Sequence, residues 1–159
     1  MTTVTLTDAL DARQLATART LFREYAAEIG VDLCFQGFER EMAELPGRYA
    51  PPDGCILLAR SDQHDAGCVA LRKLETGVCE MKRLFVRPAF RAAGVGRMLA
   101  DAVVERARRI GYARMVLDTL SQMTAAIALY RSMGFRETTP YYANPLPGVV
   151  YMELTLPGS

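Results

Sequence analysis

The sequence contains a single histidine, His64, and this scarcity limits the chemistry available to it. His64 lies in the polar stretch Ser61–Asp65, which we expect to form an exposed turn. Hydrolases that activate a serine or cysteine need an adjacent base, and histidine usually supplies it. We expect no catalytic role for His64, so the sequence excludes the Ser-His and Cys-His hydrolase schemes.

Cysteines are also few, and their spacing argues against a metal site. The four cysteines, Cys34, Cys55, Cys68 and Cys79, form no C-x-x-C pair. Structural zinc sites usually draw ligands from such closely spaced pairs, so we expect no bound metal. The last three cysteines lie in apolar segments, and we expect them to be small buried side chains in a reducing compartment.

The chain lacks both a surplus of charge and a long apolar run. Nineteen basic residues stand against eighteen acidic ones, so bulk charge predicts no affinity for nucleic acid. No apolar run approaches the length of a membrane helix. The segment Met1–Thr5 has neither the charged nor the apolar region of a signal peptide. We therefore expect a cytoplasmic protein without nucleic-acid or membrane partners.

The length of 159 residues suits a single domain, residues 1–159. Strand and helix patterns alternate, which indicates an α/β or α+β architecture. The turns Gln63–Gly67 and Glu75–Gly77 suit hairpins and predict an antiparallel meander. A first helix, capped by Asp8 or Asp11, is expected to end at Gly30. Further helices are expected over Phe38–Leu45, Val95–Ile110 and Met123–Met133, and strands over Thr3–Leu6, Cys55–Ala59, Cys68–Leu74, Val78–Val86, Ala113–Leu117, Phe135–Thr138 and Val149–Leu156.

Residues 86–97, V-R-P-A-F-R-A-A-G-V-G-R, carry the strongest functional signal. A strand ends there, a loop turns, and a helix begins with free backbone N–H groups and a positive dipole end that can hold a phosphate. Gly94 and Gly96 allow close backbone approach, and Arg91 and Arg97 can add charge-assisted hydrogen bonds. The alternative is a glycine-bearing turn with solvated arginines. The loop matches neither a Walker A motif nor G-x-G-x-x-G.

The pattern Arg91-x-x-Gly94-x-Gly96 resembles the R/Q-x-x-G-x-G/A signature of the GNAT superfamily of acyl-CoA-dependent N-acetyltransferases. Cys79–Pro88 looks like that family's fourth strand, and Leu129–Phe135 looks like its closing L-Y-x-x-x-G-F motif. These matches cover about residues 78–137 in the right order. The resemblance implies a mixed, mostly antiparallel sheet of about six or seven strands flanked by about four helices, with a splay between strands four and five.

The resemblance also implies that acetyl-CoA is the cosubstrate. Its pyrophosphate would lie on the loop, and its pantetheine arm would pair with strand backbone as an added strand does. Met123 stands where many members have an asparagine that contacts the cofactor arm. The cofactor-binding residues carried over in this way are Leu84, Phe85, Val86, Arg91, Ala92, Ala93, Gly94, Val95, Gly96, Arg97 and Met123.

Direct attack of a primary amine on the thioester is the reaction that the resemblance implies, and it calls for a base and an acid. Glu80 occupies the base position of part of the family, although it also fits a structural carboxylate paired with Lys82 or Lys73. Tyr130 occupies the acid position, although it also fits a core tyrosine. Strand alternation predicts that Glu80, Lys82, Leu84 and Val86 share one face.

The resemblance implies that the acceptor side lies between Val31–Phe38 and Pro140–Gly148. The aromatic residues there would either form a wall for a small acceptor or take part only in ordinary loop packing: Phe35, Phe38, Tyr141 and Tyr142. Asp118 and Thr119 follow a strand and would line the opening or cap the next helix.

The expected acceptor is the amine of a small molecule or peptide, and relatives suggest a homodimer. Two alternatives remain: a catalytically silent acyl-CoA-binding module and an unrelated phosphate-binding domain.

Overall fold

The computed structural model describes residues 3–30 and 37–157. Its framework is a seven-stranded sheet with the strand order β1-β2-β3-β4-β5-β7-β6. The expected mixed, mostly antiparallel sheet is confirmed. The strands are β1 Val4–Asp8, β2 Cys55–Ser61, β3 His64–Glu75, β4 Val78–Val86, β5 Arg114–Leu120, β6 Arg136–Glu137 and β7 Val149–Thr155.

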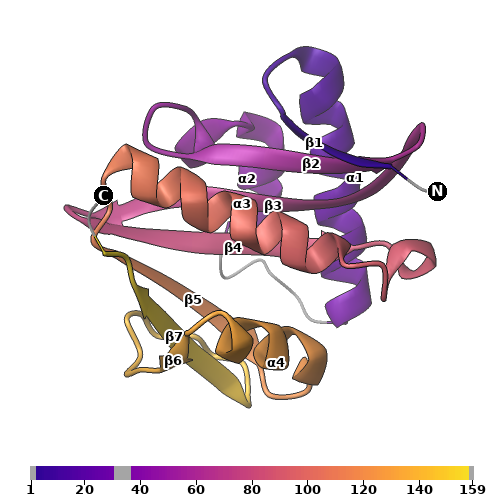
Figure 1. Ribbon diagram of the computed structural model, residues 1–159. Coiled ribbons are helices and arrows are strands. Elements are labelled where there is room, and N and C mark those ends of the chain that lie inside the picture. The colour runs from indigo at the N-terminus through magenta and orange to yellow at the C-terminus, as the bar shows by residue number, and fades with distance from the viewer. Residues whose placement is uncertain (1–2, 31–36, 158–159) are drawn as a thin grey trace.

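All neighbouring strands are antiparallel except β4 and β5, which are parallel. These two strands pair at only three positions, where Val78, Cys79 and Glu80 face residues 114–116. Beyond Glu80, β4 continues along β3 and β5 continues along β7. Figure 1 shows the result, because β4 and β5 meet at one end and diverge towards the other. The splay expected between strands four and five is therefore present.

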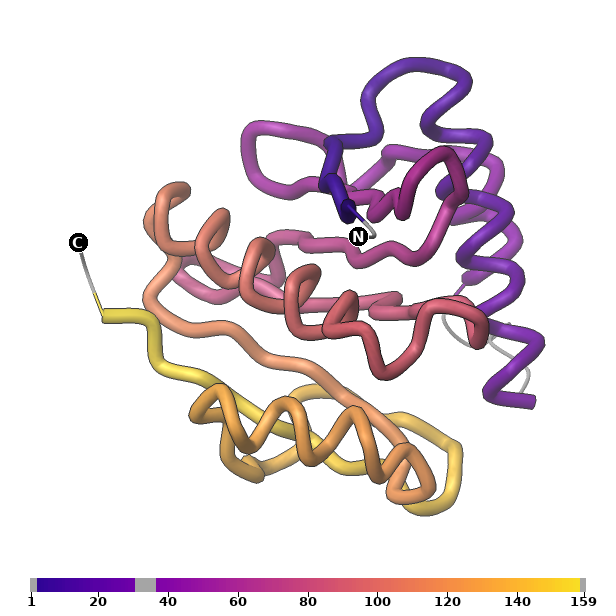
Figure 2. Tube along the Cα trace, turned by 45° about the vertical axis from the view of Figure 1, so that its right-hand side comes forward, coloured from indigo at the N-terminus to yellow at the C-terminus, as the bar shows by residue number. Residues whose placement is uncertain are grey.

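Four α-helices cover the sheet, α1 (Ala12–Ile29) and α2 (Phe38–Glu44) on one face and α3 (Val95–Ile110) and α4 (Thr124–Ser132) on the other (Figures 1 and 2). Each face has its own apolar core. Within residues 3–30 and 37–157, two short 3-10 helices lie in connecting loops, η2 (Gly47–Tyr49) and η3 (Pro88–Phe90). No helix among the described residues is long and apolar enough to cross a membrane.

Helix α1 has the start and stop signals that its sequence predicts. Asp11 is the N-cap and forms a capping box with Gln14, in which each side chain accepts from the other residue's backbone N–H. Gly30 ends the helix at φ 68°, a left-handed conformation that glycine adopts without a steric penalty. Leu21 and Phe22 are fully buried against the sheet, so α1 is fixed above the splayed strands.

A bulge in β4 determines which side chains face the opening. Arg83 has φ 62°, which is unusual for a residue with a side chain, and the register with β3 shifts at this point. The guanidinium of Arg83 is anchored on the α1–α2 face by Glu41, at 3.0 and 3.1 Å. Gly67 on β3 makes the close strand pairing possible, because an added Cβ there would lie 2.5 Å from the carbonyl oxygen of Phe85.

The predicted common face for Glu80, Lys82, Leu84 and Val86 is wrong because of this bulge. Before it, Met81 packs into the core beneath α3. After it, Leu84 and Val86 pack against that same core, whereas Phe85 packs into the core beneath α1 and α2. One extra residue reverses the alternation, so Leu84 and Val86 lie on the face opposite Glu80 and Lys82.

Several boundaries differ from those expected. Strand β1 is Val4–Asp8 rather than Thr3–Leu6, and strand β6 is Arg136–Glu137 rather than Phe135–Thr138. The expected turn Gln63–Gly67 is shorter, because His64 already pairs with Ser61 in the hairpin, although His64 is exposed as predicted. Strand β5 runs to Leu120, so Asp118 and Thr119 belong to the strand instead of following it.

The cysteines that the structure describes fit their expected packing role. Cys55, Cys68 and Cys79 are buried free thiols. Burial raises the pKa of the Cys55 thiol to about 11, so it stays protonated at neutral pH. Cys34 lies outside the described residues.

Candidate active site

An open groove of about 770 Å³ runs along the splayed edge of β4. Its floor includes Leu84, Phe85 and Val86, and its far wall is formed by α4 and its N-cap, including Met123 and Leu129. Past Glu80, no strand in the described part of the chain pairs with the backbone edge of β4 that faces β5. Such an edge offers unpaired N–H and C=O groups to an extended ligand arm.

One end of the groove is the start of α3. Gly94 is the N-cap of that helix at φ 81°, and Gly94, Val95 and Gly96 all line the groove. The first intrahelical hydrogen bond runs from the N–H of Met98 to the carbonyl of Gly94, at 3.0 Å, so the preceding N–H groups are available. A glycine N-cap brings no side-chain oxygen to occupy them. This end of the groove therefore fits a phosphate group.

The two loop arginines have different positions. Arg91 lines the groove, donates to the carbonyl of Val86 at 2.9 Å, and forms an ion pair with Glu28. Arg97 instead points away, donating to Ser132 at 2.9 Å and Asp101 at 3.3 Å. Ala92 lines the groove, whereas neither Ala93 nor the Arg97 side chain does. Arg97 can therefore contribute through its backbone N–H, and the predicted side-chain contact of Arg97 is not supported by its position.

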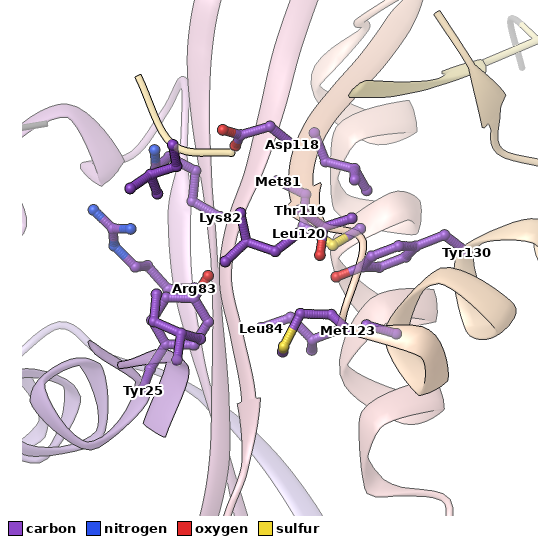
Figure 3. Close-up of a pocket in the computed structure, with 14 residues that line it drawn as sticks. Tyr25, Met81, Lys82, Arg83, Leu84, Asp118, Thr119, Leu120, Met123 and Tyr130 are labelled. Atoms are coloured by element: carbon purple, nitrogen blue, oxygen red, sulfur yellow. The ribbon is translucent and has the colours of Figure 1, made fainter. Parts of the chain in front are cut away.

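A smaller cavity of about 60 Å³ lies between the diverging strands themselves (Figure 3). It adjoins the groove, because the two share five lining residues: Tyr25, Ile29, Leu84, Met123 and Ala126. Its remaining walls come from β4, β5, α4 and the β6–β7 loop: Met81, Lys82, Arg83, Leu117, Asp118, Thr119, Leu120, Tyr130 and Leu146.

Tyr130 is a buried residue that also reaches the cavity. Its ring packs against Phe135, with the centroids 5.7 Å apart, which agrees with the expected core packing. In Figure 3 its hydroxyl points into the space beside Leu84 and Met123. Burial raises the pKa of Tyr130, so the phenol keeps its proton at neutral pH and can act as a donor. The two interpretations of Tyr130 are thus compatible.

Glu80 is fully buried and held by two partners. One oxygen accepts from Nε of Arg72 at 2.7 Å, and the other accepts from the hydroxyl of Tyr141 at 2.5 Å. Arg72 is therefore an ion-pair partner of Glu80 that the sequence did not predict. Burial alone would raise the pKa of Glu80, but Lys82, Arg72 and the two hydrogen bonds together lower it. The carboxylate is ionised at neutral pH, and it lies beside the cavity rather than on its lining.

The β6–β7 loop is tied across the splay by consecutive tyrosines. Tyr141 donates to Glu80 on β4, and Tyr142 donates to Asp118 on β5. Asn144 also donates to Asp118, at 3.0 Å. The rings of Tyr141 and Tyr142 pack against Tyr151, which extends the expected aromatic wall.

Phe38 does not belong to this wall, contrary to the prediction. Phe38 is buried in the core beneath α2, with the Arg83 guanidinium 5.4 Å from its ring centroid. Phe35 and most of Val31–Phe38 lie outside the described residues.

Comparisons with known proteins identify the family. The sequence profile described as the acetyltransferase (GNAT) family matches residues 19–135. An uncharacterized N-acetyltransferase of Schizosaccharomyces pombe is 44% identical over 140 residues, covering 87% of this chain and 86% of that protein. The chain belongs to the GNAT acetyltransferase family. It is therefore a member of a family of acyl-CoA N-acyltransferases, and acetyl-CoA is its cosubstrate, as the sequence motifs predicted.

Solved structures agree with the GNAT fold. One from Klebsiella pneumoniae, named as an acyl-CoA N-acyltransferase, is 29% identical with a TM-score of 0.72 and covers 98% of both chains. An N-acetyltransferase from Thermoplasma acidophilum in complex with coenzyme A shares the fold at 18% identity, with a TM-score of 0.74 over 96% of this chain and 99% of that one.

The groove of this GNAT chain fits coenzyme A by its own chemistry. It offers free helix N–H groups at one end, an unpaired strand edge along its length and an apolar wall opposite. Met123 belongs to that wall and touches both the groove and the cavity. At this position the chain presents an apolar thioether in place of the asparagine found in many members.

Sequence reasoning missed three contributors to the site. Tyr25 lines both spaces, but its helical spacing indicated only core packing. Lys82 and Arg83 line the cavity and are 7% and 4% exposed. The sequence did contain a sign of them, because Lys82 and Arg83 are adjacent cations inside an apolar strand. Such residues are seldom buried without a specific reason.

Arg91 gives a direct test of the groove. We expect Arg91→Ala to weaken acetyl-CoA binding by about tenfold, because it removes a charge-assisted contact to a phosphate. Isothermal titration calorimetry of the purified variant measures the change. The ion pair with Glu28 is half exposed, so its loss should affect stability little.

The matched control is Arg40→Ala, which breaks another exposed arginine–glutamate pair, that with Glu44, on α2. Its acetyl-CoA affinity should equal that of the wild type. Equal affinity for Arg91→Ala as well would contradict the assignment of this loop to the cofactor.

Proposed function

We propose that this GNAT protein transfers an acetyl group from acetyl-CoA to the primary amine of a small molecule by direct attack. The amine nitrogen forms a bond to the thioester carbonyl carbon, and the C–S bond then breaks. The proton lost by the amine passes to a base, and the departing thiolate takes a proton from an acid. A peptide amine is the second acceptor class that remains compatible with the family.

The observation that carries this proposal is that the groove adjoins the cavity between β4 and β5, with five wall residues in common. A pantetheine arm lying along Leu84–Val86 would bring its thioester to the narrow end, near Leu84 and Tyr130. The amine then approaches from the opposite side of the sheet, through the space under the β6–β7 loop. Two reactants held in this way meet without bulk diffusion, which is a large part of acyl-transfer catalysis.

A small acceptor is favoured by the size of the cavity and by the loop tied across it. The cavity is about 60 Å³, and two tyrosine–carboxylate hydrogen bonds fix the loop over the splay. One relative points the same way. The human N-acetylaspartate synthetase, 34% identical over 69% of this chain and 37% of its own length, has a name that states a small acetylated product.

The direct test is release of free CoA from acetyl-CoA in the presence of a panel of amines, followed with a thiol reagent. We expect amine-dependent release with at least one small primary amine, and an N-acetylated product by mass spectrometry. Acetyl-CoA binding without amine-dependent release across small amines and peptides would contradict the proposal.

Tyr130 is the proposed acid for the departing thiolate. We expect Tyr130→Phe to lower kcat by about 100-fold with little change in acetyl-CoA affinity, because only the hydroxyl proton is lost. The control is Tyr112→Phe, whose hydroxyl donates to the carbonyl of Asp53, away from the cavity. That variant should keep its kcat. A normal kcat for Tyr130→Phe would leave Tyr130 as a packing residue only.

Glu80 is the proposed base, and Tyr141 allows this role to be separated from a structural one. We expect Glu80→Gln to lower kcat by about 100-fold, mostly at pH values below the pKa of the amine, where a proton must be removed. Since the pKa of Glu80 is lowered, its own titration should not appear between pH 6 and 9.

Tyr141→Phe removes the loop's hydrogen bond to Glu80 but leaves the carboxylate in place. It should raise the acceptor KM with a small effect on kcat. If both variants raised the acceptor KM and left kcat unchanged from pH 6 to 9, Glu80 would be a positioning residue rather than the base.

A further inference from the structure

Two arginine–glutamate pairs tie the loop before α3 to helix α1 (Figure 2). Arg87 bonds with Glu24, and Arg91 bonds with Glu28, one turn further along the same helix. Neither Arg87 nor Glu24 lines the groove or the cavity, whereas Arg91 and Glu28 both line the groove. A contact in this position either coexists with the cofactor or is exchanged for it.

The side chain of Arg91 is folded onto the floor of the groove. Its guanidinium carbon lies over the ring of Phe85, 5.9 Å from the ring centroid. Its Nε donates to the carbonyl oxygen of Val86 at 2.9 Å, and a terminal nitrogen donates to Glu28. Since Glu28 belongs to α1 and Val86 to β4, the guanidinium connects a wall of the groove with its floor.

The carbonyl of Val86 belongs to the open edge of β4. The N–H of Arg87, in the same peptide group, donates to the carbonyl of Ala66 on β3 at 2.8 Å. Because the N–H and C=O of a trans peptide point in opposite directions, the Val86 oxygen points away from β3 and towards the splay. Arg91 therefore occupies one of the backbone acceptors that this edge would offer to an extended arm.

The carboxylate of Glu28 and a phosphate group would compete for the same guanidinium. Both are anions that bind arginine through charge-assisted hydrogen bonds. The side chains of Arg91 and Glu28 are 46% and 36% exposed, and ion pairs exposed to this extent contribute little to stability. A phosphate also accepts from the free N–H groups at the start of α3, so it gains contacts in the exchange.

We propose that Glu28 is a further residue of the cofactor site, which holds Arg91 over the empty groove and is exchanged for a phosphate oxygen of acetyl-CoA on binding. The Glu28–Arg91 pair is called the clasp below. The clasp keeps the guanidinium at the phosphate end of the groove and lowers the affinity for acetyl-CoA. Glu28 acts on binding alone, so this role is independent of the proposed acyl transfer and rests only on the assignment of the loop before α3 to the phosphates.

Glu28→Gln tests the clasp, because it removes the charge of the side chain and keeps its shape. We expect the variant to bind acetyl-CoA about three- to fivefold more tightly than the wild type, which corresponds to the loss of one exposed ion pair that competes with the ligand. Isothermal titration calorimetry of the purified variant measures the change. Unchanged or weaker binding would overturn the inference, since Glu28 would then be unrelated to the cofactor or would support Arg91 in binding it.

Glu24→Gln is the matched control. It removes the same charge from α1, one turn before Glu28, and it breaks the pair with Arg87, which does not line the groove. Both pairs are partly exposed, so each variant should fold as the wild type does. The acetyl-CoA affinity of Glu24→Gln should equal that of the wild type. An equal gain in the two variants would be a general effect of the charge of α1 and would overturn the clasp.

A double variant separates exchange at Arg91 from simple repulsion between Glu28 and the cofactor. In the Arg91→Ala protein the clasp is already absent, so adding Glu28→Gln should change the acetyl-CoA affinity by less than about 1.5-fold. The two substitutions are therefore expected to be strongly non-additive. A gain as large as that in the wild-type background would show that Glu28 acts on the phosphates without Arg91, and it would contradict the exchange.

Failure of the loop assignment gives a different result from failure of the clasp alone. If Arg91→Ala and Glu28→Gln both leave the acetyl-CoA affinity unchanged, Arg91 does not hold the cofactor, and the clasp is overturned with that assignment. If Arg91→Ala weakens binding while Glu28→Gln does not tighten it, the assignment stands and only the clasp is overturned. No acceptor is present in these titrations, so their results do not depend on whether an amine is acetylated.

Discussion

Strands β4 and β5 pair over three residues and then separate, and this limited pairing is the constraint from which the site follows. Each strand keeps its outer neighbour, so the sheet stays continuous while its centre opens. The open edge of β4 would cost free energy if it were buried without partners. A ligand that pairs with this edge removes the cost, which is why the splay is suited to an extended cofactor arm.

The bulge at Arg83 gives the opening two chemically different sides. Because the alternation reverses there, Leu84 and Val86 face the helix α3 side, where the groove and the glycine-bearing loop before α3 lie. Lys82 remains on the side of α1 and α2, near Asp118 and the β6–β7 loop. The same strand thus presents backbone and apolar side chains to the groove, and charged side chains to the cavity beneath the β6–β7 loop. The residue at the bulge, Arg83, is buried and forms an ion pair with Glu41 on α2.

Local sequence signals were sufficient for much of this architecture. The capped helix ending at Gly30, the helix Val95–Ile110 and the glycine loop before it depend on neighbours in the chain, and they lie where predicted. The face of Leu84 could not be predicted, because the bulge is a feature of how β4 pairs with β3, and its residue Arg83 bonds with Glu41, far away in sequence. The sequence also did not predict the contacts of Glu80 with Arg72 and Tyr141, because these residues come from another strand and a distant loop. Pairings of this kind are set by tertiary packing, which a periodic pattern does not contain.

The central claim is that the splayed edge of β4 binds the pantetheine arm, in addition to the loop that binds phosphate. Calorimetric titration of the protein with acetyl-CoA and, separately, with 3′,5′-ADP tests this claim most directly, because the nucleotide fragment lacks the arm. The account predicts that acetyl-CoA binds much more tightly than 3′,5′-ADP. Equal affinities, or no binding of acetyl-CoA, would contradict it, and the splay would then be a feature of the fold without a role in the cofactor site.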